Sequence, residues 1–219
     1  MIWTLPNILT VARIALTPVI ALLPFIRGAT PKLIAFAIFI AASISDIYDG
    51  RIARRRQEVT DLGKLLDPLA DKLLLFATLV PIYWITRYPT RQYELPWWGN
   101  LPLWVLALLI GRELFMTGFR WWANRRGVVI AAQRAGKVKT VIQSIFIGAT
   151  ILWFAWKDLA SAHGWRRGWL GAFWERIHGT VVAVTLAVAI LVTVYSLGHY
   201  LYRYRGLFRS AAAPTSDGR

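Results

Sequence analysis

Residues 46–71 read DIYDGRIARRRQEVTDLGKLLDPLAD, and this stretch decides how the chain folds. Asp46 and Asp49 are three residues apart and Asp67 and Asp71 are four apart, so each pair occupies one face of a helix. A short basic loop between the pairs predicts two antiparallel neighbouring helices. At about 1.5 Å per residue, Asp46 and Asp71, which are farther from the loop, lie roughly 12 Å below the membrane surface. Asp49 and Asp67, which are nearer to the loop, lie roughly 6–8 Å below it. The four carboxylates are therefore predicted to converge.

The composition places this stretch in a membrane protein. Hydrophobic residues make up 57% of the 219 residues and charged residues 17%, with a mean hydropathy of +0.47, whereas soluble domains carry roughly 25% charged residues. The chain has no cysteine, which excludes disulfides and thiolate chemistry. These values exclude disorder, a disulfide scaffold and an ordinary soluble enzyme. The net charge of +15 fits inside-positive topology and anionic ligands, so no nucleic-acid partner is expected.

Six apolar segments are long enough to span a bilayer, which takes about 20 residues. No stretch alternates as a strand would, and backbone groups in lipid require helices. The segments cover residues 9–25, 33–51, 63–88, 101–119, 138–156 and 180–200. We predict an all-α integral membrane protein with one six-helix domain over residues 1–205 and a disordered cytosolic tail over residues 206–219.

The distribution of Lys and Arg predicts the orientation. Fifteen of the 26 fall on the side of the basic loop and the C-terminus, and eight fall on the other side. The richer side should be cytosolic, which places both termini and the acidic residues there. Arg13 interrupts the first apolar run and no basic region precedes that run, so no cleaved signal peptide is expected.

Four carboxylates cannot share a low-dielectric site without neutralisation. Protonation and pairing with Arg or Lys are two solutions. Binding of hard divalent cations is the third, and oxygen ligands suit Mg²⁺ or Mn²⁺. Gly50 and Ala53 would let a flat ligand approach, Arg54 can meet a diphosphate, and Thr60 or Asp61 can cap the second helix. This pattern favours a two-metal centre for displacement at phosphorus.

These residues resemble the signature of the CDP-alcohol phosphotransferase (phosphatidyltransferase) family. Every fixed position and the eight-residue gap match, at Asp46, Asp49, Gly50, Ala53, Arg54, Gly63, Asp67 and Asp71. The resemblance implies six transmembrane helices around a cytosol-facing polar cavity, commonly in a homodimer. It also implies that Asp46, Asp49 and Asp67 hold two metal ions and that Asp71 is the general base and a possible further ligand.

Cues outside the signature are similar to the bacterial phosphatidylglycerophosphate synthase branch of the family. They lie within residues 6–13, 66–72, 112–120 and 136–143. The resemblance implies transfer of a phosphatidyl group from CDP-diacylglycerol to sn-glycerol 3-phosphate, with release of CMP, in the lipid environment of the inner (plasma) membrane. Relatives that use inositol phosphate or serine share the catalytic core, so another acceptor stays open.

The resemblance also assigns binding residues. Contacts to the CDP-lipid are expected from Gly50, Ala53, Arg54, Gly63, Asn7 and Thr10. An anionic acceptor needs fixed positive charge, for which the candidates are Arg112, Arg120, Lys137 and Lys139. Glu113 or a signature aspartate is an alternative partner for Arg112, and setting the topology is an alternative role for the two lysines. No catalytic role is expected for the histidines, His163, His178 and His199.

Two rival functions were weighed against this interpretation. An intramembrane prenyltransferase also uses aspartates and Mg²⁺ on a diphosphate, but six spans are too few for it and the Gly-x-x-Ala-Arg core is not its pattern. A cation transporter could use the acidic residues, but it would need a polar path to the far side of the membrane. The last three apolar segments carry few polar residues away from their cytosolic ends.

Overall fold

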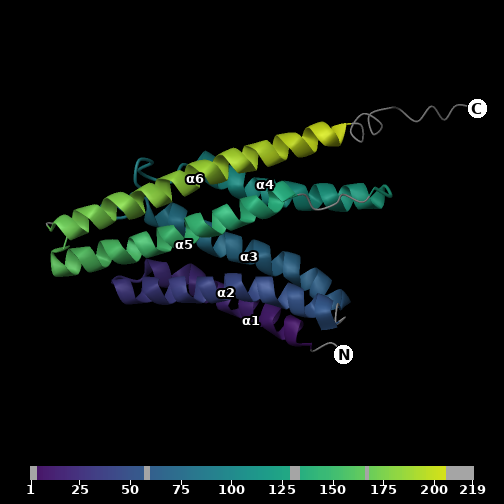
Figure 1. The fold of residues 1–219 in the computed structure, drawn as a ribbon, viewed down its shortest axis with the longest axis horizontal. Coiled ribbons are helices and arrows are strands. Elements are labelled where there is room, and N and C mark those ends of the chain that lie inside the picture. Colours follow the sequence, from purple (N-terminus) through teal and green to yellow (C-terminus); the bar gives the residue numbers. More distant parts are fainter. Residues whose placement is uncertain (1–3, 57–59, 129–133, 166–167, 206–219) are drawn as a thin grey trace, which may run out of the picture.

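The computed structural model describes residues 4–56, 60–128, 134–165 and 168–205, and its regular elements over these ranges are helices. The predicted tail over residues 206–219 lies outside them. In Figure 1 the helices form an elongated bundle whose two chain ends lie toward the same end of the long axis. In chain order the elements are α1 (Leu5–Leu22), the 3-10 turn η1 (Leu23–Phe25), α2 (Ala29–Arg56), α3 (Asp61–Ile85), α4 (Leu103–Arg125), α5 (Arg134–His163) and α6 (Trp169–Arg203).

Four stretches of helix in the described ranges are long and apolar enough to cross a membrane. They are Leu5–Phe25, Ala29–Asp46, Val138–His163 and Trp169–Arg203. The helices α3 and α4 are 25 and 23 residues long, but charged side chains interrupt both of them, including Asp71 and Arg112. The chain is thus an all-helical protein with the composition of a membrane protein, and both of these interrupted helices carry predicted site residues.

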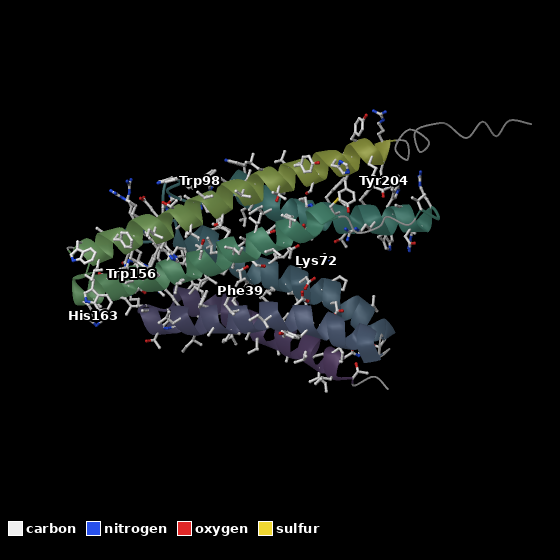
Figure 2. All side chains as sticks on the ribbon, viewed as in Figure 1. Phe39, Lys72, Trp98, Trp156, His163 and Tyr204 are labelled. Carbon is white, nitrogen blue, oxygen red and sulfur yellow. The ribbon has the colours of Figure 1, made fainter. Side chains whose placement is uncertain are left out.

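The surface of the bundle is more apolar than that of a soluble protein, and several polar side chains are buried. Large apolar side chains such as Leu22, Leu65 and Leu191 are about two thirds or more exposed, while Arg13, Lys32 and other polar side chains are almost fully buried. Figure 2 shows side chains projecting outward along the whole length of the helices. A lipid surrounding favours this arrangement, since it accepts apolar groups and makes exposed charges expensive.

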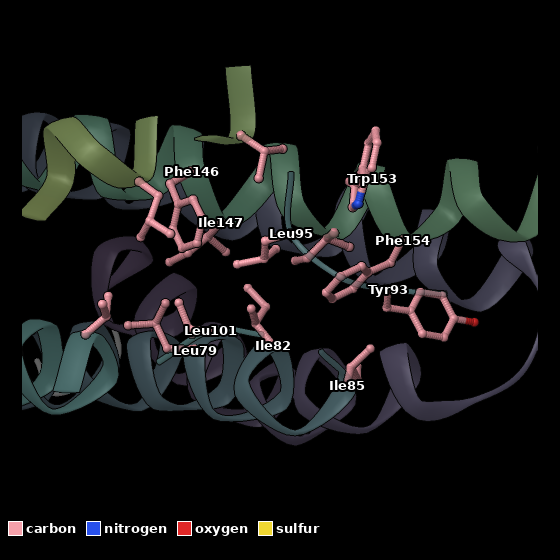
Figure 3. Packing of buried hydrophobic residues seen from close by; sticks show 14 of the residues in the cluster. Leu79, Ile82, Ile85, Tyr93, Leu95, Leu101, Phe146, Ile147, Trp153 and Phe154 are labelled. Carbon is pink, nitrogen blue, oxygen red and sulfur yellow. The ribbon is translucent and has the colours of Figure 1, made fainter. Parts of the chain in front are cut away.

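The apolar core lies in the half of the bundle away from the chain ends. Leu79 and Ile82 of α3 face Phe146 of α5, and the connection between α3 and α4 inserts buried Leu95 beside them (Figure 3). Close packing of these side chains fixes the distance between α3 and α5.

Over the described residues, α1 packs on both α2 and α3, and it is the main packing partner of α3. Farther across the bundle, α2 packs on α5 and α5 packs on α6. The sequence-based expectation that the two signature helices are direct neighbours is therefore wrong in this respect. The loop between them is short, but over the described residues α3 packs mainly on α1, and α2 packs on α1 and α5.

A buried polar cluster ties the helices together at the end opposite the chain ends. Lys32 Nζ of α2 lies 2.7 Å from Asp158 Oδ2 of α5, and it also donates to the carbonyl of Ile26 at 2.9 Å. Tyr93 and Gln92 donate to the other oxygen of Asp158, at 2.5 and 2.9 Å. Burial, together with the hydrogen bond to Asp158, raises the pKa of Tyr93. The cluster has the good geometry that makes a buried ion pair tolerable.

Substitution Asp158→Asn is expected to lower stability by about 3 kcal/mol, because it leaves the Lys32 ammonium buried without a counter-charge. Thermal unfolding in detergent, followed by tryptophan fluorescence, measures the effect. The matched control is Glu94→Gln, since the pair of Glu94 with Arg91 is 3.7 Å long and largely exposed and should contribute little. Equal unfolding temperatures for the two variants would contradict the role given to the cluster.

Candidate active site

A stripe of buried polar side chains runs along one face of α1. Asn7, Thr10 and Arg13 follow one another at intervals of three residues, and each is at most 3% exposed. Such spacing keeps the three side chains on one side of the helix. Each of them contacts part of the signature stretch, so α1 organises the site.

Arg13 connects acidic residues from two different helices. Its Nη1 lies 2.6 Å from Asp46 Oδ1 of α2 and 3.3 Å from Asp71 Oδ1 of α3. The Arg13 side chain is 1% exposed, whereas the side chains of Asp46 and Asp71 are 44% and 60% exposed. The guanidinium therefore lies on the buried side of two carboxylates that are open to the surroundings.

Asn7 joins α1 to the beginning of α3. The Thr60 hydroxyl accepts a hydrogen bond from the Gly63 amide at 3.0 Å, which confirms the predicted N-cap. The side-chain amide of Asn7 donates to the same hydroxyl at 2.9 Å. A Cβ atom on Gly63 would come within 2.8 Å of Asn7 Oδ1. The glycine of the signature is thus required here for the close approach of α1 and α3.

Thr10 contacts the third signature acid that the structure describes. Its hydroxyl lies 2.9 Å from Asp67 Oδ1 and 3.1 Å from the carbonyl oxygen of Pro6, and its hydrogen can be donated to either. Asn7 and Thr10, which were predicted to contact the CDP-lipid, thus hold parts of α3 in this structure. Sequence reasoning missed these contacts and the bridge made by Arg13. The available signal was a polar residue at every third position of an otherwise apolar helix.

Predicted site residues whose side chains lie outside the described part of the structure are Asp49, Gly50, Ala53, Arg54 and Lys137. Among the described side chains, no three acids or histidines form a group that could hold a metal ion. Asp46 and Asp71 nevertheless meet at one guanidinium, and their partly exposed carboxylates offer the oxygen ligands that hard divalent cations prefer. The donor set present therefore fits the predicted metal ions.

A second charged cluster links α4 to α5. Arg112 Nη1 lies 2.6 Å from Glu113 Oε1, and Lys139 Nζ contacts the same oxygen. Glu113 is one of the two alternative partners that the sequence left open for Arg112. Arg112 and Lys139 are 6% and 2% exposed. The structure thus brings together two of the four residues predicted to bind the acceptor.

In and beside this second cluster lie buried donors that have no hydrogen-bond partner among the described residues. They are Nε and Nη2 of Arg112 and the side-chain nitrogen of Gln143, which lies one turn after Lys139 on α5. An unpaired buried donor costs about 1–3 kcal/mol, so an anionic ligand would satisfy groups that the fold leaves unsatisfied. Arg120, the remaining described candidate, is exposed two turns farther along α4.

A cavity lies at the opposite end of the molecule, and the described residues that line it do not include a predicted site residue. The cavity has a volume of about 880 Å³ and is lined by residues such as Trp153, Lys157 and Glu175. His178 stacks on Trp153 and lies 2.8 Å from the carbonyl oxygen of Ala149. This is the packed role expected for the histidine, far from the acids.

Comparison with known proteins agrees with this geometry. The chain matches the model of the CDP-alcohol phosphatidyltransferase family over residues 3–195. It is 37% identical over 151 residues to the probable phosphatidylglycerophosphate synthase of Mycobacterium tuberculosis, covering 68% of this chain and 66% of that protein. It is 38% identical over 162 residues to the CDP-diacylglycerol–glycerol-3-phosphate 3-phosphatidyltransferase of Bacillus subtilis, covering 68% and 77%. The protein of the same name from Salmonella typhimurium is 29% identical over 206 residues, covering 93% and 96%.

Substitution Gly63→Ala is expected to destabilise the protein by about 1–3 kcal/mol, because the added methyl group overpacks the contact with Asn7. Thermal unfolding measures the change. At Gly198, where a Cβ would meet no atom within 4 Å, the same substitution should be neutral or stabilising, since alanine favours a helix. Adding Asn7→Ala to Gly63→Ala should cost less than the two single effects together. Strict additivity would show that the two residues do not constrain one another.

Proposed function

Because the chain belongs to the CDP-alcohol phosphatidyltransferase family, we propose that it transfers the phosphatidyl group of CDP-diacylglycerol to sn-glycerol 3-phosphate and releases CMP. It is thus proposed to be a CDP-diacylglycerol–glycerol-3-phosphate 3-phosphatidyltransferase of phospholipid biosynthesis. The observation that carries this proposal is the contact of one buried guanidinium with Asp46 and Asp71. It brings together, across two helices, acids that the signature separates by 25 positions.

The signature acids are proposed to hold two metal ions, Mg²⁺ or Mn²⁺, through Asp46, Asp49, Asp67 and Asp71. Bound ions of this kind neutralise the diphosphate and stabilise the charge that develops during displacement at phosphorus. The oxygen donors of the described acids support this assignment. Arg13 approaches one carboxylate oxygen each of Asp46 and Asp71, Thr10 approaches one of Asp67, and these contacts orient the groups.

The CDP-lipid is proposed to lie along α2 and the start of α3. The residues assigned to it are Gly50, Ala53, Arg54, Gly63, Asn7 and Thr10. Of these, Asn7, Thr10 and Gly63 act through the contact between α1 and α3 that the structure shows. A rigid contact of this kind fixes the position of the substrate relative to the acids, and positioning supplies much of the rate in transfers at phosphorus.

Asp71 is proposed to be the general base. The acceptor hydroxyl attacks the phosphorus on the lipid side of the diphosphate, and its proton passes to the Asp71 carboxylate. The new oxygen–phosphorus bond forms as the bond from that phosphorus to the oxygen of CMP breaks. The Asp71 side chain is 60% exposed, so an acceptor hydroxyl can reach it without a rearrangement of α3.

The acceptor phosphate is proposed to bind near α4 and α5, through Arg112, Arg120, Lys137 and Lys139. The unpartnered donors of Arg112 support this placement, because phosphate oxygens accept hydrogen bonds from a guanidinium in pairs. A phosphate-binding cluster favours glycerol 3-phosphate or inositol phosphate over serine, which has no phosphate. The names of the three relatives favour glycerol 3-phosphate over inositol phosphate.

The protein is proposed to work as a single six-helix transmembrane domain in the inner (plasma) membrane, as a homodimer. Both termini and the site would face the cytosol. The start of α1 and the end of α6 lie toward one end of the bundle, the end nearer to Lys72 of α3 in Figure 2. In the sequence, fifteen of the 26 Lys and Arg residues fall on the side of the basic loop and the C-terminus, as cytosolic loops require.

The purified protein is expected to release CMP when it is supplied with CDP-diacylglycerol, Mg²⁺ and glycerol 3-phosphate. The substitution Asp67→Asn should lower the rate of CMP release at least a thousandfold without unfolding the protein. Inositol phosphate, inositol and serine are supplied in parallel reactions, and EDTA should abolish turnover in each active one. CMP release with another acceptor alone would reassign the substrate. Near-normal turnover by Asp67→Asn would remove the metal role.

Substitution Lys139→Ala is expected to raise KM for glycerol 3-phosphate about tenfold or more, because it removes a buried cation from the proposed acceptor site. KM for CDP-diacylglycerol should change much less. Steady-state CMP release with each substrate varied in turn measures both constants. An unchanged acceptor KM would place Lys139 outside the acceptor site.

A further inference from the structure

We propose that Arg13 is a positioning residue that holds Asp46 and Asp71 in the arrangement that binds the divalent cations. The inference rests on the proposed metal role of the signature acids. Arg13 lies outside the signature stretch, on a helix to which the family signature assigns nothing.

The first argument is the origin of the two acids. Asp46 belongs to α2 and Asp71 to α3, and over the described residues both helices pack on α1 and hardly on each other. Arg13 Nη1 reaches a carboxylate oxygen from each of them. The relative position of the two acids is therefore set by the helix that lies against both, and Arg13 is the side chain of that helix that contacts them.

The second argument is electrostatic. Two carboxylates that meet at one nitrogen atom repel each other, and a positive charge between them offsets this repulsion. The guanidinium supplies a permanent positive charge, since arginine is not deprotonated in proteins. It also carries several donors in a rigid plane, so it can hold two carboxylates in fixed directions where an ammonium group would act as a single point charge.

The third argument is the side from which Arg13 approaches. Its side chain is 1% exposed, while the two carboxylates are about half exposed. The guanidinium thus takes one oxygen of each acid from the buried side and leaves the open side of the carboxylates for a ligand. Residues that hold metal-binding carboxylates from behind commonly change metal affinity 10- to 100-fold when they are removed.

The position of Arg13 predicts whether metal binding becomes weaker or tighter when its side chain is removed. If Arg13 only neutralised the acids in the absence of metal, the guanidinium would compete with cations, and its removal would tighten metal binding. If Arg13 positions the acids, its removal weakens metal binding, because the carboxylates then separate to reduce their repulsion. The buried approach favours the second outcome.

The test measures Mn²⁺ binding to the purified, metal-free full chain in detergent, by the electron paramagnetic resonance signal of free Mn²⁺. Arg13→Gln is expected to weaken binding 10- to 100-fold, and Arg13→Lys to weaken it several-fold. Arg87→Gln is the matched control. Arg87 follows the end of α3 that is far from the acids and stacks on Tyr83, so its substitution should leave Mn²⁺ affinity unchanged. Unchanged or tighter binding by Arg13→Gln overturns the inference.

Thermal unfolding of each variant separates positioning from loss of fold. Should Arg13→Gln not fold, Arg13→Lys decides, and wild-type affinity in that variant overturns the inference. Turnover is measured separately with CDP-diacylglycerol and glycerol 3-phosphate, where kcat should fall in Arg13→Lys while the acceptor KM stays within about twofold. A wild-type protein that binds Mn²⁺ but turns over no acceptor refutes the proposed function and leaves the Arg13 inference standing. A wild-type protein that binds no Mn²⁺ overturns both the metal role and this inference.

Discussion

The neutralisation of acidic side chains inside an apolar bundle is the constraint on which the rest of this structure depends. Asp46, Asp67 and Asp71 lie on helices whose surroundings disfavour charge, and each accepts a hydrogen bond from a buried side chain of α1. Because α1 carries these donors on one face, it must lie against both α2 and α3. The packing of the first three helices thus follows from the need to provide partners for the acids.

The two ends of the bundle differ: one is closely packed, and the other carries the candidate site residues. One end contains the apolar core and the satisfied cluster around Lys32 and Asp158, which connects α2, α5 and the long connection after α3. The other end carries partly exposed acids and buried donors that no group in the described ranges satisfies. A well-packed end can hold the helices at fixed distances, so the other end can keep polar groups unsatisfied until a ligand binds them.

The two charged clusters of the site have opposite composition. Two described acids contact Arg13 and a third contacts Thr10, one turn earlier on α1, and this excess of acid suits a metal and diphosphate centre. Around Glu113, two cations outnumber one acid, which suits an anionic acceptor. Different helices build the two clusters, so a change in α4 or α5 could alter the acceptor while α1, α2 and α3 keep the chemistry at phosphorus. Complementary charge of this kind gives specificity more than affinity.

The sequence by itself determined what depends on neighbouring residues along the chain. The spacing of the aspartates placed each pair on one helix face, Thr60 marked the start of α3, and the match to the family signature indicated phosphatidyl transfer. Only the tertiary structure decided that α1 lies against both signature helices, that Arg13 bridges Asp46 and Asp71, and that Glu113 holds Arg112 beside Lys139. Helical periodicity fixes positions within one helix, whereas the partner of a buried charge depends on which distant helices pack together, and packing depends on the shapes of side chains from the whole chain.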